Sequence, residues 1–179
     1  MSQAIQSLRE MISESDNIVF FGGAGVSTES GIPDFRSVDG LYSQKYDYPP
    51  ETILSRSFFE RNPEAFYNFY RDKLVVNNAK PNAAHIRLAE LEAAGKLKAV
   101  ITQNIDGLHQ AAGSKRVLEL HGTLSRAYCS RCGKVYDGAV LSSGGVPKCE
   151  KCGATVRPDV TLYGEALDGF IWRDAEGEI

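Results

Sequence analysis

Residues 18–27 read Ile18-Val19-Phe20-Phe21-Gly22-Gly23-Ala24-Gly25-Val26-Ser27, and this stretch decides the fold. A continuous apolar run that ends at glycines is typical of a buried parallel strand followed by a tight loop. The G-x-G-x-x-G template of phosphate-binding loops fails at its third glycine, because Thr28 stands there. No strand ending in an acid follows about twenty residues later, so the ordinary ribose clamp is absent too. The loop alone therefore fits either a pyrophosphate site or a simple tight turn.

Helical and strand-like stretches alternate along the rest of the chain. Apolar spacing predicts helices over residues 3–14, 63–76 and from the cap Asn82 to Gly95. Apolar runs predict further strands at 98–102, 117–120 and 160–163. Glycine and proline make residues 31–50 a long loop, of the kind that is usually functional. The alternation predicts an α/β domain with a mostly parallel sheet.

Polar residues follow three of the predicted strands, at 23–27, 102–106 and 121–122. Ligands of open α/β sheets lie beyond the carboxyl ends of the strands. His121 alone would fit a satisfied core histidine, but it shares a predicted face with Asn104 and Asp106. Its neutral imidazole could take a proton from a sugar hydroxyl near pH 7. Asp106 could accept from a carboxamide N–H, and Asn104 could orient a hydroxyl or a water.

Three other polar residues give weaker signals. Arg36 suits either a phosphate or a surface ion pair. His85 and His109 fit helix packing and a loop, and we assign them no chemistry.

The chain has four cysteines, in two C-x-x-C pairs with sixteen residues between them. This spacing is that of a structural zinc site, in which four thiolates close the coordination shell. Two disulfides would need an oxidising compartment, and no secretory segment precedes the polar start of the chain. A redox C-x-x-C is usually single. We therefore predict one structural zinc ion held by Cys129, Cys132, Cys149 and Cys152.

The composition excludes several classes of protein. The chain has 179 residues, 42% of them hydrophobic and 24% charged, as in an ordinary globular protein. No apolar run approaches the roughly 20 residues of a membrane span. The net charge of −3 argues against a general nucleic-acid-binding surface. We expect the protein to be located in a reducing cytoplasm and to bind neither a membrane nor a nucleic acid.

Several motifs together resemble one family. They are Gly23-Ala24-Gly25-x-Ser27, Gly31-Ile32-Pro33-Asp34-Phe35-Arg36, Thr102-Gln103-Asn104-Ile105-Asp106-Gly107-Leu108-His109, Glu119-Leu120-His121-Gly122 and the four cysteines. In this order they resemble the sirtuins of bacterial type, which are NAD-dependent protein lysine deacylases. The resemblance covers residues 5–165. It implies a Rossmann-like NAD-binding domain over residues 1–123 and 156–165, with a zinc module inserted at 124–155.

The resemblance also implies a reaction. In sirtuins the acyl-lysine oxygen attacks the nicotinamide ribose, nicotinamide leaves, and the acyl group ends on ADP-ribose. This chain is thereby expected to convert acetyl-lysine of a protein or peptide to free lysine, O-acetyl-ADP-ribose and nicotinamide. His121 and Asn104 become the catalytic residues, with His121 as general base for the ribose hydroxyls.

The resemblance assigns binding roles as well. Ser27 and Asn104 would hold the ribose, Ile105 and Asp106 would line the nicotinamide pocket, and Phe35 would shield the reactive sugar carbon. The implied NAD contacts are Ala24, Ser27, Thr28, Phe35, Arg36, Gln103, Asn104, Ile105, Asp106 and His121. A substrate peptide would add as a strand to Val160, Leu162, Tyr163, Gly164 and Glu165. Residues 37–46 lack the Tyr-x-x-Arg pair of desuccinylases, which favours an uncharged acyl group such as acetyl.

The resemblance stops at Glu165. A complete sirtuin continues through a helix, a Gly-Thr-Ser turn and further strands, whereas residues 166–179 form an acidic tail without an apolar run of strand length. We therefore expect a C-terminally truncated sirtuin with an incomplete sheet. The alternative to an active deacetylase is a catalytically inactive, zinc-stabilised fragment from a truncated or frame-shifted gene. A zinc-ribbon nucleic-acid binder is a third hypothesis.

Overall fold

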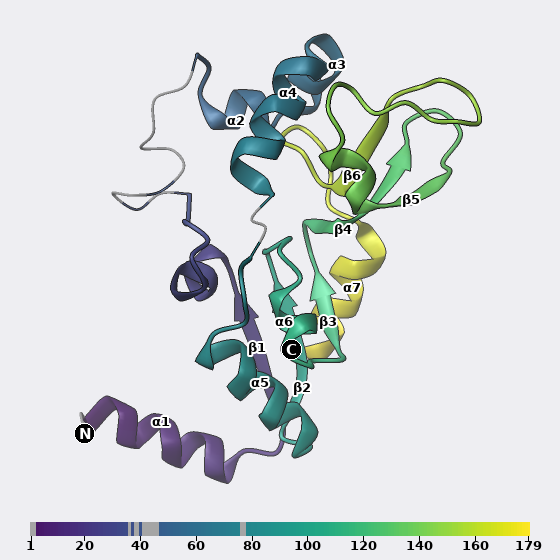
Figure 1. Ribbon diagram of the computed structural model, residues 1–179. Coiled ribbons are helices and arrows are strands. Elements are labelled where there is room, and N and C mark those ends of the chain that lie inside the picture. The colour runs from purple at the N-terminus through teal and green to yellow at the C-terminus, as the bar shows by residue number, and fades with distance from the viewer. Residues whose placement is uncertain (1–2, 36, 38–39, 41–46, 76–77) are drawn as a thin grey trace.

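The predicted parallel sheet is present, and it forms the lower half of the molecule in Figure 1. The computed structural model describes residues 3–35, 37, 40, 47–75 and 78–179. Within these residues, the parallel strands run in the order β1-β2-β3, formed by Ile18–Gly22, Leu97–Thr102 and Val117–Glu119. Val100 and Ile101 of the central strand are 0% and 1% exposed, as expected for a strand covered on both faces. The predicted α/β class is thus confirmed.

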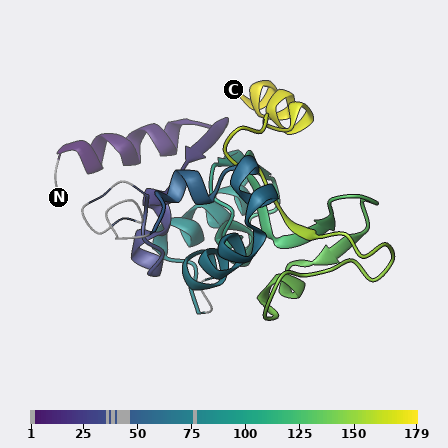
Figure 2. The same cartoon turned by 90° about the horizontal axis from the view of Figure 1, so that it is seen from above.

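Helices cover both faces of this sheet. On one face, α5 (Ala83–Ala93) packs Leu91 against Leu97 and Val100. On the other face, α7 (Gly169–Glu178) packs Ala175 against Ile101 and other residues of β2 and β3. Figure 2 shows α7 at the upper edge of the view, away from the helices α2, α3 and α4. The short helix α6 (Leu108–Ala111) lies beside α5.

The tail, for which the sequence predicted no element, forms the helix α7. Asp168 caps it, because its carboxylate accepts from the backbone N–H groups of Phe170 and Ile171. Arg116, next to β3, binds Glu178 at 2.9 Å and so ties the end of the helix to the sheet. These contacts and the burial of Ala175 give the acidic tail a defined place in the fold.

A second, antiparallel sheet has the order β5-β4-β6. Its strands are Gly122–Cys129 (β4), Val135–Asp137 (β5) and Val156–Val160 (β6), with the 3₁₀ helix η4 (Gly138–Ser142) after β5. Helices distant in sequence pack on it: α2 (Pro50–Ile53), α3 (Arg56–Arg61), α4 (Pro63–Phe69) and the π-helix η3 (Tyr70–Leu74). We call residues 50–74 and 122–165 together the small lobe.

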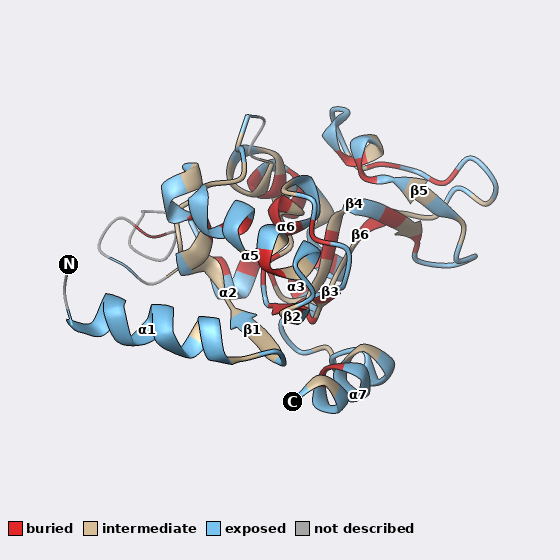
Figure 3. Ribbon diagram, turned by 90° about the horizontal axis from the view of Figure 1, so that it is seen from below, coloured by how far each residue is buried: buried red, intermediate tan, exposed pale blue. Residues whose placement is uncertain are grey.

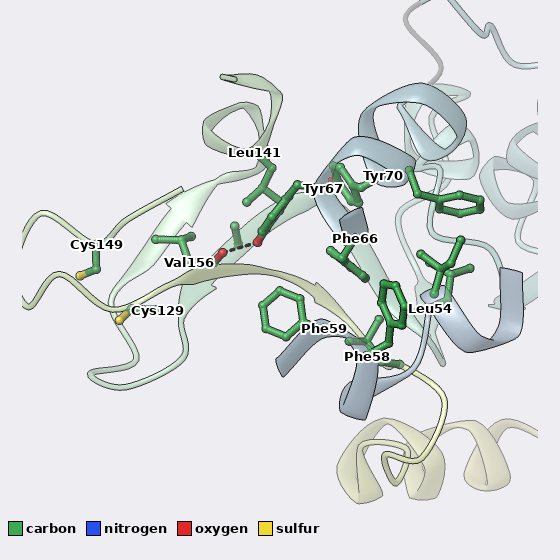
Figure 4. Close-up of a cluster of buried hydrophobic side chains, with 14 residues drawn as sticks. Leu54, Phe58, Phe59, Phe66, Tyr67, Tyr70, Cys129, Leu141, Cys149 and Val156 are labelled. Carbon is green, nitrogen blue, oxygen red and sulfur yellow. Dashed lines mark hydrogen bonds between the residues drawn. The ribbon is translucent and has the colours of Figure 1, made fainter. Parts of the chain in front are cut away.

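One hydrophobic core holds the two parts of the small lobe together (Figure 4). Phe66 and Tyr67 of α4 have no exposed surface, and their rings meet edge to face at 5.3 Å. The Tyr67 hydroxyl donates to the backbone carbonyl of Val156 in β6. Burial raises the pKa of Tyr67 well above its ordinary value, so this hydroxyl keeps its proton.

Several predicted elements differ from the structure. The predicted helix 63–76 is α4 followed by η3, which ends at Leu74. The strand predicted at 160–163 is β6, which ends at Val160; beyond it only Tyr163 forms a bridge, with Ser55. Helix α3 was not predicted, although Ser55 caps it by accepting from Phe58 N–H. Of the predicted loop 31–50, residues 36, 38–39 and 41–46 lie outside the described residues.

The N-terminal helix α1 (Gln3–Glu14) has the predicted span but no buried residue (Figure 3). Its C-terminal end is held by Lys96, whose ammonium donates to the carbonyls of Ile12, Ser13 and Ser15 at 2.8–3.1 Å. A cation at this end of a helix also interacts favourably with the helix dipole. Among the described residues, no helix combines the length and the apolar character that crossing a bilayer would require.

The bond between Tyr67 and Val156 generates a stability prediction. Tyr67→Phe removes the hydroxyl and leaves a buried carbonyl without this donor, so we expect a loss of about 1–3 kcal/mol in the free energy of unfolding. Urea denaturation would measure it. Tyr48→Phe is the matched control, since Tyr48 is 48% exposed and its change should stay within about 0.5 kcal/mol. Equal effects of the two substitutions would contradict the assignment.

Candidate functional site

A cleft of about 650 Å³ lies between the parallel sheet and the small lobe. One wall consists of residues that follow the strands of the parallel sheet: Ala24 and Ser27 after β1, Gln103–Asp106 after β2 and His121 after β3. The opposite wall comes from the small lobe, with Phe66, Tyr70 and the residues at the end of β6. The size suits a small-molecule or cofactor site.

The structure brings nearly all predicted site residues to this cleft. Eight of the ten predicted NAD contacts and all five predicted peptide contacts line it. The two exceptions are Thr28 and Arg36. Thr28 is exposed, and its hydroxyl donates to Gly25 O at 3.0 Å within the 3₁₀ helix η1 (Ala24–Ser30). Arg36 lies outside the described residues. Their roles in binding stay predictions.

Ser27 is the centre of a buried hydrogen-bond network beside the cleft. It is 1% exposed, its hydroxyl donates to Asp106 Oδ2 at 2.7 Å, and it accepts from Asn104 Nδ2 at 3.0 Å. Asp106 Oδ1 in turn accepts from Leu108 N–H at 2.9 Å. The network links the loops after β1 and β2, and it fixes the orientation of both Asn104 and Asp106.

His85, to which the sequence assigned no chemistry, completes this network from behind. Its Nδ1 accepts from Asn82 N–H at 3.3 Å, so the neutral ring carries its proton on Nε2. Nε2 faces Ser27 Oγ at 3.5 Å, which is long for a hydrogen bond. The sequence did contain a signal for the position of His85. A polar residue three positions after an N-cap Asn is the pattern of a capping box.

His109 packs against His85, with ring centroids 4.7 Å apart, and is 1% exposed. Neither of its ring nitrogens has a hydrogen-bond partner among the described residues. Burial, together with the neighbouring His85, lowers the pKa of His109 to about 4. Burial likewise lowers the pKa of His85. Both rings are therefore neutral at pH 7, behind the carboxylate of Asp106.

His121 lines the cleft, half-buried, two residues after the end of β3. Its Nδ1 lies 2.9 Å from the backbone carbonyl of Gln103. A carbonyl only accepts, so Nδ1 carries the proton and Nε2 keeps its lone pair. Gly122 has a φ of +83°, and a Cβ there would collide with the carbonyl oxygen of Asp159. Only glycine therefore lets the chain turn from His121 directly into β4.

The end of β6 forms a second part of the cleft. The residues Val160, Thr161, Leu162, Tyr163, Gly164 and Glu165 all line it, and we call them the wall segment. Glu165, a predicted peptide contact, forms a bidentate ion pair with Arg157, at 2.6 and 2.8 Å. Sequence reasoning missed Arg157, whose signal was no more than an arginine three residues before the strand predicted at 160–163. The peptide-binding role of the wall segment stays a prediction.

The four cysteines converge as predicted. Their sulfur atoms all lie within 4.8 Å of one another, with 3.4 Å between Cys129 and Cys152 and 3.6 Å between Cys132 and Cys149. A disulfide would need about 2.0 Å. A tetrahedron of 2.3 Å zinc–sulfur bonds has edges of about 3.8 Å. The four thiols thus fit a closed zinc site. Tyr136 donates to Cys149 Sγ at 3.1 Å and lowers the pKa of Cys149 to about 6.

Fold and site together define a class: an α/β protein with a ligand cleft at the carboxyl edge of a parallel sheet and a four-cysteine metal module beside it. Residues 23–177 match the model of the Sir2 family, a range that includes most of the tail. This chain belongs to the Sir2 family.

Related proteins and structures agree with this membership. An NAD-dependent protein deacetylase of Clostridium perfringens (strain 13 / Type A) is 60% identical over 98% of this chain and 73% of its own length. One from Clostridium acetobutylicum is 57% identical over 93% of the chain and 70% of its own length. A solved structure described as "Sir2-p53 peptide-NAD+" is 43% identical, with a TM-score of 0.85 over 99% of this chain and 71% of that one.

The cysteine cluster predicts one zinc ion per chain. We expect Cys149→Ser to lose that zinc and to lower the melting temperature, because zinc binding contributes directly to the folding of such modules. Elemental analysis of the purified protein measures the stoichiometry. Ser130→Ala, in the first cysteine pair, is the matched control and should keep its zinc. A Cys149→Ser protein with a full zinc complement would contradict the site.

The buried His109 predicts a pH dependence of stability. Its pKa is about 4 in the folded protein and near 6.5 when unfolded, so the unfolded chain binds more protons between these values. The stability from its neutral form is complete above pH 6.5 and is lost as the pH falls toward 4. The loss between pH 7 and pH 4.5 amounts to about 2–3 kcal/mol.

His109→Phe keeps an aromatic ring and removes this titration. We therefore expect the stability difference between wild type and variant to shift by that amount, in favour of the variant, between pH 7 and pH 4.5. Urea unfolding at the two pH values measures it. Acid loss of zinc affects both proteins and cancels in the comparison. A pH-independent difference would show that His109 is not buried neutral.

Proposed function

We propose that this protein is an NAD-dependent protein lysine deacetylase, which consumes NAD and water and converts acetyl-lysine to free lysine, nicotinamide and O-acetyl-ADP-ribose. The observation that carries the proposal is the geometry of His121. Its Nδ1 is held by Gln103 O at 2.9 Å, which leaves Nε2 as a base at the edge of the cleft. Relatives up to 60% identical are named NAD-dependent protein deacetylases, which supports the same assignment.

The residues of the parallel-sheet wall suit the dinucleotide. Asn104 and Asp106 are oriented by Ser27, so an amide and a carboxylate are preset for polar groups of a ribose and a carboxamide. Gly25 has room for a ligand, since a Cβ there would meet no atom of the described residues within 4 Å. When bound, NAD supplies the nicotinamide leaving group of the reaction. We assign Ala24, Phe35, Gln103 and Ile105, which also line the cleft, to the same ligand.

His121 acts in this scheme as general base. The hydrogen bond to Gln103 O fixes the tautomer and the ring plane, so the imidazole needs no rearrangement before it takes a proton at Nε2. Asn104, 9% exposed, holds its amide in place through Ser27 and orients a hydroxyl or a water. The wall segment on the opposite side would hold the acetylated peptide. The apolar side chains Phe66, Leu124 and Leu162 in the cleft favour an uncharged acyl group.

Two of the basic residues of the zinc module argue against the zinc-ribbon hypothesis. Lys134 pairs with Glu150 and Arg126 pairs with Asp159, so acidic partners neutralise side chains that a nucleic acid would need. Four cysteines that form a zinc site and no disulfide suit a reducing cytoplasm. An inactive zinc-stabilised protein remains the alternative function, because the core of the small lobe forms a cluster separate from those of the parallel sheet.

The decisive experiment is an assay of nicotinamide release. Purified zinc-loaded protein, NAD and an acetyl-lysine peptide should release nicotinamide, and His121→Ala should lower the rate by about 10²–10⁴, the usual contribution of a general base. Release from the wild type no faster than from His121→Ala would favour the inactive alternative. Calorimetric titration with NAD tests binding separately and distinguishes a protein that binds without turnover from one that does not bind.

A further inference from the structure

The Glu165 side chain closes the wall segment on itself. Its Oε1 accepts from Arg157 Nη1 at 2.6 Å, and its Oε2 accepts both from Arg157 Nη2 at 2.8 Å and from the backbone N–H of Leu162 at 2.9 Å. The backbone N–H of Glu165 donates to Leu162 O at 3.0 Å. The carboxylate is thus engaged within the chain at both oxygens.

Arg157 is held as firmly as the acid it binds. Its side chain is 9% exposed, and Nη2 also donates to Val160 O at 3.0 Å. The guanidinium lies between two rings, 5.6 Å from the centroid of Phe59 and 5.4 Å from that of Tyr128. One planar group therefore connects the strand β6, both ends of the wall segment and an aromatic residue of α3.

The rest of the wall segment is fixed by backbone hydrogen bonds. Thr161 N–H donates to the carbonyl of His121 at 2.9 Å. Tyr163 N–H donates to Leu54 O, and Tyr163 O accepts from Arg56 N–H, both at 3.0 Å. The N–H groups of residues 161, 162, 163 and 165 are thereby all used within the chain. Gly164, at φ +88°, forms the tip between them.

A buried ion pair usually contributes little net stability to a fold. Its desolvation cost is often as large as its attraction, and apolar replacements of similar volume are often neutral or stabilising. Here the Nε–H of Arg157 also has no partner among the described residues, which adds to the cost. Burial alone would raise the pKa of Glu165, but the hydrogen bonds from Arg157 lower it below its ordinary value. The pair is thus charged at pH 7.

We propose that Arg157 is a positioning residue, which through Glu165 holds the wall segment in the shape that receives the acylated peptide. This inference rests on the proposed function and deepens it. It gives Glu165 an internal role, and of the N–H groups of residues 161–165 it leaves that of Gly164, which has no partner among the described residues, for pairing with a peptide. Arg157 is not among the residues that line the cleft. Replacing Arg157 should therefore raise the KM for the peptide and leave the KM for NAD unchanged.

The test replaces the pair by neutral residues of similar size. R157M/E165Q removes both charges and keeps an amide oxygen for the Leu162 N–H. R157K is a milder second variant, since an ammonium keeps the charge but cannot reproduce the bidentate geometry. R87M/E90Q is the matched control, because it makes the same two chemical changes in an exposed pair on α5. Zinc content and melting temperature establish that each protein is folded.

Two readouts are measured on each folded protein. Hydrogen exchange followed by mass spectrometry reports on the amides of residues 160–166 without any need for activity. Steady-state kinetics with an acetyl-lysine peptide give separate KM values for peptide and NAD. We expect R157M/E165Q to exchange these amides at least about tenfold faster and to raise the peptide KM by about tenfold or more, with the NAD KM within about twofold. R157K should lie between this variant and the wild type, and R87M/E90Q should match the wild type.

The outcomes separate the inference from the function on which it rests. Unchanged exchange in R157M/E165Q overturns the positioning role, whatever the kinetics show. Faster exchange with an unchanged peptide KM, in an active protein, overturns its link to the substrate. An inactive wild type with faster exchange in the variant would refute the proposed function and leave the structural role of Arg157 standing. If R157M/E165Q fails to bind zinc or to fold, the same criteria apply to R157K.

Discussion

The parallel pairing of β2 with both of its neighbours is the constraint on which the rest of this structure depends. The ladder continues past the ends of the strands, since Gln103 N–H donates to Gly22 O and Leu120 N–H donates to Thr102 O, each at 2.9 Å. These two bonds align three loops that are far apart in sequence. Without that alignment Ser27 could not reach Asp106, and His121 could not bind the carbonyl of Gln103.

The small lobe supplies the other half of the cleft, and its architecture is discontinuous. Helices 50–74 share a core with strands that begin about fifty residues later, and the aromatic residues Phe59, Phe66 and Tyr67 fill the space between them. The metal module lies at the far side of this core, where Cys129 and Cys149 belong to the same buried cluster. Because one core joins the module to the cleft wall, the zinc site can hold the wall without taking part in chemistry.

Sequence reasoning found what is local and missed what depends on distant contacts. The strand at 18–22 could be predicted from its apolar run, the cysteine cluster from its spacing, and the residues that line the cleft from their places after strands. The packing of α4 against β6 could not be predicted from the sequence, because the bond from Tyr67 to Val156 joins residues 89 positions apart. The same holds for His85, whose reach to Ser27 depends on how α5 packs. For Arg157, the surrounding rings come from α3 and β4. The helix in the tail could not be predicted, because α7 buries only Ala175 fully and leaves Phe170 and Trp172 exposed, so its apolar residues show no clear buried face.

The hydrogen bond from Thr161 N–H to His121 O has one more consequence. The residue proposed as the base and the segment proposed to carry the substrate are neighbours through main-chain atoms alone. The separation of their main chains is set by this bond and by peptide geometry, which stretches very little. Under the proposed function the cleft would therefore act as a molecular ruler. A carrier side chain one methylene shorter or longer than lysine would place its carbonyl about 1 Å from the required point, an error large enough to lower a rate by about 10².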